Sequence, residues 1–112
     1  MDRGEKVRMR DYIGQHLDLT GTRLSDDQAQ RLVNFIDDYD QYRGRSFTEN
    51  SSRSGWSSDG RYTRNETVVD TFTDTVGIHR EQHYRDDDGQ EGSHAQNITN
   101  ARGILDWLDT HR

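Results

Sequence analysis

The residues best suited to recognition chemistry lie between positions 42 and 64, in the stretch YRGRSFTENSSRSGWSSDGRYTR. This stretch gathers basic and aromatic side chains within a chain whose formal net charge is -6. A guanidinium can hold a phosphate or a carboxylate through a planar pair of donors, and an aromatic ring can stack on a base or fill a pocket of a partner. The candidate binding residues are Arg43, Arg45, Arg53, Trp56, Arg61, Tyr62 and Arg64.

The sequence leaves three interpretations of this stretch open. It is a contact surface for another protein or another copy of the chain, or it binds a nucleic acid or a nucleotide-like anion. In the third interpretation it is structural: Phe47, Trp56 and Tyr62 join the core and the arginines meet the protein's own Asp-rich helix. The acidic net charge disfavours nucleic acid, because phosphate contacts must overcome repulsion from the acidic segments. Residues 65–91 alone carry eight acids against two arginines, and such segregation favours contacts within a chain or between copies.

A second candidate group is HREQH, residues 79–83. On a strand, His79, Glu81 and His83 share one face and could offer two imidazoles and a carboxylate to a metal. On a helix Glu81 would face away from both histidines, so the zinc-protease arrangement is not expected. A polar sheet face in water is the favoured interpretation, so we predict no metal ligand and no cofactor. A metal-dependent enzyme at this face is a second alternative function.

Signatures of common enzymes are missing from the sequence. It contains no P-loop, no G-x-G-x-x-G turn and no G-x-S-x-G elbow. The segment YRDDDGQEGSHA matches a calcium loop only in its middle, because Tyr84 and Ala95 stand where carboxylates are needed. We therefore predict that the protein is not an enzyme.

The elements that position these residues are predicted from helix caps and apolar spacing. Three helices are expected, opened by the pairs Asp2…Glu5, Ser25…Gln28 and Ser93…Gln96, with Gly44 ending the second. Their apolar stripes point to a common core. In chain order the stripes are Met9, Tyr12, Ile13 and Leu17; Ala29, Leu32, Val33, Ile36 and Tyr39; and Ala95, Ile98, Ala101, Leu105 and Leu108, with Ile104 and Trp107 at the margin of the third.

Three strands are expected between the second and third helices, near residues 46–56, 61–73 and 76–85, with turn signals at SSDGR and DDDGQEG. Alternation along the last strand directs Val76, Ile78 and Tyr84 toward the helices. It directs His79, Glu81, His83 and Arg85 to an open face. The predicted fold is a single α+β domain over residues 1–112. It has two N-terminal helices, a three-stranded mainly antiparallel sheet and a C-terminal helix packed on one sheet face.

Composition sets the remaining expectations. The 112 residues fit one domain, and the lack of cysteine excludes disulfides and thiolate metal sites. No apolar run is long enough for a membrane span, and no apolar segment follows the basic N-terminus, so we expect a cytoplasmic or virion protein that is not secreted by a signal peptide. The favoured function is a non-enzymatic interaction or assembly module that self-associates or binds a protein partner. Small accessory and virion-assembly proteins of viruses and mobile elements share this general character.

Overall fold

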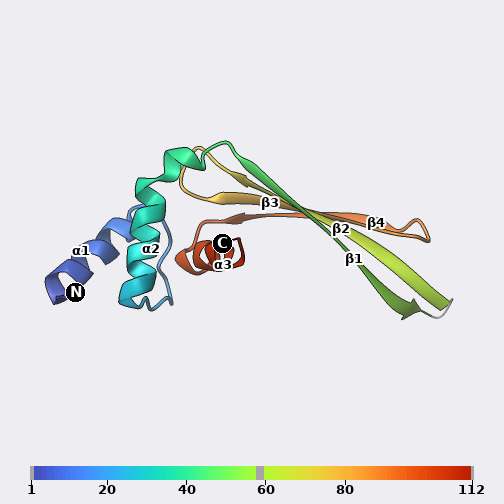
Figure 1. Ribbon diagram of the computed structural model, residues 1–112, viewed down its shortest axis with the longest axis horizontal. Helices are drawn as coiled ribbons and strands as arrows, with labels where there is room; N and C mark the ends of the chain where they lie inside the picture. Colours follow the sequence, from blue (N-terminus) through green and yellow to red (C-terminus); the bar gives the residue numbers. More distant parts are fainter. Residues whose placement is uncertain (1, 58–59, 112) are drawn as a thin grey trace.

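A computed structural model describes residues 2–57 and 60–111. It shows an α+β fold whose helices gather at one end while a four-stranded antiparallel sheet projects away from them (Figure 1). The principal extents of the molecule are 61 × 26 × 23 Å. The helices are α1 (Arg3–Gly14), α2 (Asp26–Asp37), the short 3-10 helix η1 (Tyr39–Gln41) and α3 (Ala101–Thr110). The strands are β1 (Ser46–Ser57), β2 (Gly60–Phe72), β3 (Ile78–Asp86) and β4 (Glu91–Ile98).

The first two helices begin where their caps predicted. The Asp2 carboxylate accepts a hydrogen bond from the backbone N–H of Glu5 at 2.7 Å, and Ser25 and Gln28 form a reciprocal capping box. The predicted stripe of α2 is buried at Ala29, Leu32 and Ile36, and Phe35 joins it. The predicted stop at Gly44 is wrong, because α2 already ends at Asp37. Gly44 instead makes the turn from η1 into β1, where its positive φ of 79° suits glycine.

The third helix begins later than predicted, and the sheet has a fourth strand. Residues 91–98 pair antiparallel with β3, with Gly92 beside Tyr84 and Ile98 beside Ile78. The helix starts only after Asn100, whose side chain accepts a hydrogen bond from the N–H of Gly103 at 2.7 Å. The Ser93…Gln96 prediction is wrong because the DDDGQEG turn folds the chain back along β3. There the strand ladder satisfies the backbone groups that a helix cap would serve.

The four strands follow one another in chain order, so the sheet is built from three consecutive hairpins. Asp59 of the predicted first turn lies outside the described residues, but Ser57 and Gly60 are paired on either side of it, as that turn predicted. We call the side of the sheet that carries Phe72 and Ile78 the helix face and the opposite side the open face. Ile78 is buried, whereas Val76, predicted to precede it on the same strand, lies just before β3.

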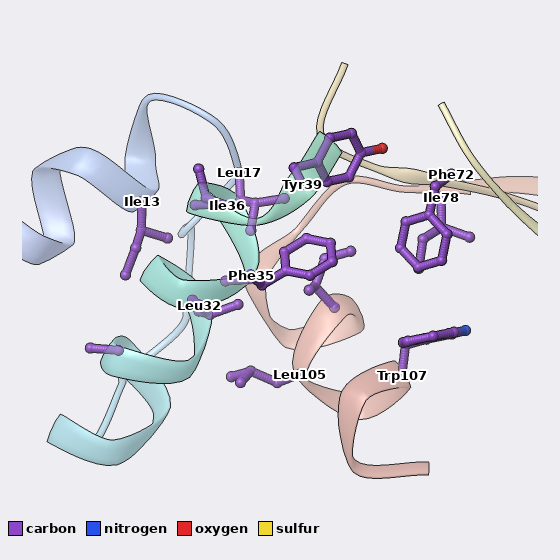
Figure 2. Close-up of a cluster of buried hydrophobic side chains, with 13 residues drawn as sticks. Ile13, Leu17, Leu32, Phe35, Ile36, Tyr39, Phe72, Ile78, Leu105 and Trp107 are labelled. Carbon is purple, nitrogen blue, oxygen red and sulfur yellow. The ribbon is translucent and has the colours of Figure 1, made fainter. Parts of the chain in front are cut away.

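The hydrophobic core lies between the helices and the base of the sheet (Figure 2). Phe72 is 1% exposed, and its ring centroid lies 6.0 Å from that of Phe35 and 5.0 Å from that of Trp107. The Tyr39 hydroxyl lies within hydrogen-bond distance of three carbonyl oxygens of the loop between β2 and β3, with that of Thr73 at 2.7 Å, and it accepts a hydrogen bond from the N–H of Gly77 at 3.2 Å. The sheet is therefore held to the helices mainly through its base.

A buried ion pair between Asp70 and Arg80 lies at the edge of the core, where the sheet extends away from the helices. The Asp70 carboxylate, 2% exposed, accepts hydrogen bonds from Arg80 Nε at 2.7 Å and Arg80 Nη2 at 3.0 Å. It also accepts one from Trp107 Nε1 at 3.2 Å. A single buried carboxylate thus links β2, β3 and α3.

Candidate functional site

The outer half of the sheet extends past all three α-helices (Figure 1). We call this part, residues 50–57, 60–67, 83–86 and 91–93, the arm. Every residue of β1 from 48 to 54 is exposed, which means that both faces of this strand lie in water. The arm therefore offers two sheet faces and an edge for contact without any rearrangement of the core.

Two of the seven predicted binding residues lie at the base of the sheet, away from the arm. Arg43 pairs with the Asp40 carboxylate and donates from Nε to the carbonyl oxygen of Asp74 at 3.0 Å. Its guanidinium also lies over the Tyr39 ring, 5.3 Å from the centroid. Arg45 is exposed and leads into β1. The structure therefore separates Arg43 and Arg45 from the other predicted site residues.

Three predicted residues share the helix face of the arm: Arg53, Tyr62 and Arg64. Arg64 forms a bidentate pair with Asp86, with Nε 2.7 Å from one carboxylate oxygen and Nη2 3.3 Å from the other. These hydrogen bonds, and the charge of Arg64, lower the pKa of Asp86 below its usual range. Arg53 pairs more loosely with Glu66, at 3.1 Å. Both arginines are therefore already matched by carboxylates of the same chain, but these lie on β2 and β3, so the predicted pairing with the Asp-rich helix is wrong for Arg53 and Arg64.

Two tyrosines cover glycines on the helix face of the arm. A methyl group on Gly55 would lie 2.7 Å from the Tyr62 hydroxyl, and one on Gly92 would lie 2.5 Å from the Tyr84 ring. The Arg64 guanidinium lies 4.5 Å from the centroid of the Tyr84 ring. These contacts link neighbouring strands and stabilise their pairing in the arm.

The last two predicted residues, Trp56 and Arg61, are cross-strand neighbours at the end of the arm, on the open face. The Trp56 side chain is 81% exposed. The structural interpretation of the opening stretch is therefore wrong for Trp56. It is correct for Phe47, whose ring packs against Phe72 and Trp107, and Tyr62 is half-buried.

Three further residues of the arm, Glu66, Tyr84 and Asp86, were not predicted as part of the site. Tyr84 was expected to pack on the helices. It does lie on the helix face of the sheet, but in the arm, where no helix covers it, and it is 38% exposed. Asp86 and Glu66 were seen in sequence only as members of an acidic segment. Their arginine partners follow from the registers of β2 with β3 and of β1 with β2, which bring residues far apart in the sequence side by side.

The predicted histidine row does share the open face of the sheet. Glu81 lies between two imidazoles, 3.3 Å from His79 Nε2 and 3.6 Å from His83 Nε2. His79 also shares a hydrogen bond of 2.9 Å with Asn97 Oδ1. This bond, together with Glu81, raises the pKa of His79 above its usual value. Within residues 2–57 and 60–111, no group of three histidine, cysteine or acidic side chains is placed to hold a metal ion.

The class that the fold and the surface define is an α+β protein with a projecting antiparallel sheet. Comparison of the chain with protein-family models, with curated proteins and with solved structures gave no significant match in any of the three. Among the described residues, no helix combines the length and apolar character that crossing a membrane requires.

Proposed function

We propose that this protein is a non-enzymatic protein-interaction or assembly module and that the arm is its contact surface. The observation that carries the proposal is Trp56, which is 81% exposed at the end of a sheet that projects beyond the helices. Covering an indole removes about 150 to 250 Å² from water, at about 25 cal/mol per Å². Tryptophan and arginine are also the residues most enriched among energetic hot spots of interfaces. Trp56, Arg53 and Arg61 are thus the proposed main contacts.

The cross-strand contacts within the arm support this proposal. The Arg64–Asp86 pair and the two tyrosine–glycine contacts order strands that have little core to pack against. Because the surface is ordered before binding, a partner does not have to immobilise it, and the entropy cost of association is smaller. An arm of this kind suits recognition better than catalysis, since it presents extended faces to the solvent.

Protein is the favoured partner over nucleic acid because of the charges on the arm. Arg53 and Arg64 already pair with Glu66 and Asp86, so a phosphate would have to displace a carboxylate and remain close to it. A protein partner can instead accept both signs of charge. The acidic composition and short chain support a further part of the proposal, a viral or mobile-element accessory protein that lies in the cytoplasm or the virion.

Site-specific photo-cross-linking tests the proposal. A benzophenone amino acid is placed at position 56 and, as the control, at position 7. Val7 is 53% exposed and lies on α1, within the helical end of the molecule. After irradiation in the cells that make the protein, we expect a protein adduct at position 56 that is absent from position 7, whether with a different protein or with a second copy. Mass spectrometry then identifies the cross-linked partner.

Binding of the identified partner is then measured with two variants. Trp56→Ala should weaken it about tenfold or more at every salt concentration, because an aromatic anchor acts through buried area. Arg53→Ala combined with Arg61→Ala should weaken it mainly at low salt. Equal labelling at positions 56 and 7 would overturn the proposal. Tight, steeply salt-dependent binding of an oligonucleotide would replace it with the nucleic-acid alternative.

A further inference from the structure

Strand β1 leaves a long edge of the sheet unprotected. It is 12 residues long, it is the first strand in the sheet order, and within the described chain β2 is the only strand beside it. Natural proteins blunt such edges with proline, with bulges or with charged side chains, especially lysine. The β1 sequence contains neither proline nor lysine, and its register with β2 runs without a bulge from Ser46 beside Thr71 to Ser57 beside Gly60. The edge is therefore a continuous template for another strand.

The ladder with β2 determines which backbone groups face this edge. The N–H of Phe72 bonds to the carbonyl of Arg45 at 2.9 Å, immediately before the first paired residues of β1. Hydrogen-bonded and non-hydrogen-bonded pairs alternate along an antiparallel ladder. Odd-numbered residues of β1 therefore bond to β2, and even-numbered residues direct their N–H and C=O groups outward.

The charges of β1 form a self-complementary pattern. Glu49 and Arg53 are the charged residues of the strand, and they lie two positions on either side of Ser51. If two β1 strands pair antiparallel about Ser51, Glu49 of each copy lies opposite Arg53 of the other. Centring the pair on Glu49 or on Arg53 would instead place like charges opposite each other, which is destabilising. The Ser51 register also pairs even-numbered residues with even-numbered ones, such as Asn50 with Ser52. The outward N–H and C=O groups of the two strands can therefore bond to each other.

We propose that a second copy of this chain is the partner of the arm, bound by antiparallel pairing of the two β1 strands about a two-fold axis at Ser51. This inference rests on the function proposed above and names its partner. The interface is isologous, with the two four-stranded sheets joined into one and the helices at opposite ends. Trp56 of one copy then lies opposite Ser46 of the other, beside the Ser46–Thr71 hydroxyl pair of 2.8 Å.

Single cysteines test the register, because the chain has no cysteine of its own. Ser51→Cys places two thiols opposite each other in a non-hydrogen-bonded pair, with Cα atoms about 4.5 Å apart and within reach of a disulfide. The matched control is Ser54→Cys, an equally exposed serine of the same strand. Its counterpart in the second copy would be six residues away along the ladder, about 20 Å. We expect rapid disulfide dimers from Ser51→Cys and few from Ser54→Cys.

A charge swap provides the second test. Glu49→Arg and Arg53→Glu should each raise the dimer dissociation constant about tenfold, because each turns two opposite-charge pairs into like-charge pairs. The double variant, Glu49→Arg with Arg53→Glu, should restore dimerisation. Sedimentation equilibrium measures the dissociation constants, and far-UV circular dichroism verifies that each variant is folded.

The outcomes separate this inference from the proposed function. A monomer at high micromolar concentration, or equal cross-linking of the two cysteine variants, overturns the β1–β1 pairing. If position 56 still cross-links to a different protein, the interaction function stands without it. If position 56 yields no adduct of either kind, both proposals fail.

Discussion

Changing Asp70 to asparagine tests how much the Asp70–Arg80 ion pair at the base of the sheet contributes to the free energy of unfolding. The substitution keeps the size of the side chain but removes the charge. It also replaces one carboxylate oxygen with an NH2 group that faces donors. Arg80 and Trp107, which together donate three hydrogen bonds to this carboxylate, then lose at least one acceptor. Asp70 itself is 2% exposed, so water cannot readily take over these bonds.

The expected magnitude follows from the burial of the two partners. Breaking a buried ion pair by removing one partner costs about 3 to 5 kcal/mol. The Arg80 side chain keeps 26% of its surface exposed, so it can recover part of its hydration. We therefore expect Asp70→Asn to lower the free energy of unfolding by about 2 to 4 kcal/mol. For a chain of this length, that lowers the thermal midpoint by about 8 to 17 °C.

Urea unfolding followed by circular dichroism measures this change. Glu66→Ala is the matched control, because it removes the exposed Arg53–Glu66 pair of the same sheet face and should cost about 0 to 1 kcal/mol. A double-mutant cycle with Arg80→Met should show that the two substitutions are not additive. A loss below 1 kcal/mol for Asp70→Asn, or an effect equal to that of the control, would refute the reasoning.

Two further predictions concern the core and the open face. Ile36→Ala, which truncates a side chain 7% exposed, should lower the free energy of unfolding by about 2 to 5 kcal/mol. The control is Val7→Ala, at a position 53% exposed, which should change the free energy of unfolding by less than about 0.5 kcal/mol in the same urea experiment. Similar losses for Ile36→Ala and Val7→Ala would show that α2 does not pack as described. His79 should titrate above its unfolded pKa of about 6.5 in NMR, and Asn97→Ala should lower its pKa, since Asn97 favours the protonated ring. The associated stability should be complete below about pH 6.5 and disappear as pH rises through the folded pKa; an unshifted His79 would contradict the hydrogen bond.

Local chemistry in the sequence determined the start of the first two helices and the alternation of β3. A cap at Asp2 or Ser25 satisfies donors only a few residues away, so its signal is contained in the sequence itself. The same holds for the period of two that separates Ile78 from the open-face residues His79 and Glu81. The seven predicted binding residues were found by composition alone, and they remain a prediction of function.

Only the tertiary structure decided what the local signals could not. The Ser93…Gln96 pattern caps no helix, because pairing with β3 satisfies the backbone of residues 91–98 instead. Arg64 meets Asp86, 22 positions away in sequence, through the register of β2 with β3. Trp56 remains in water because the sheet carries it beyond the reach of the helices. These outcomes depend on which residues of distant segments become neighbours and on how far the sheet extends past the helices, and neither helix caps nor strand alternation specify this.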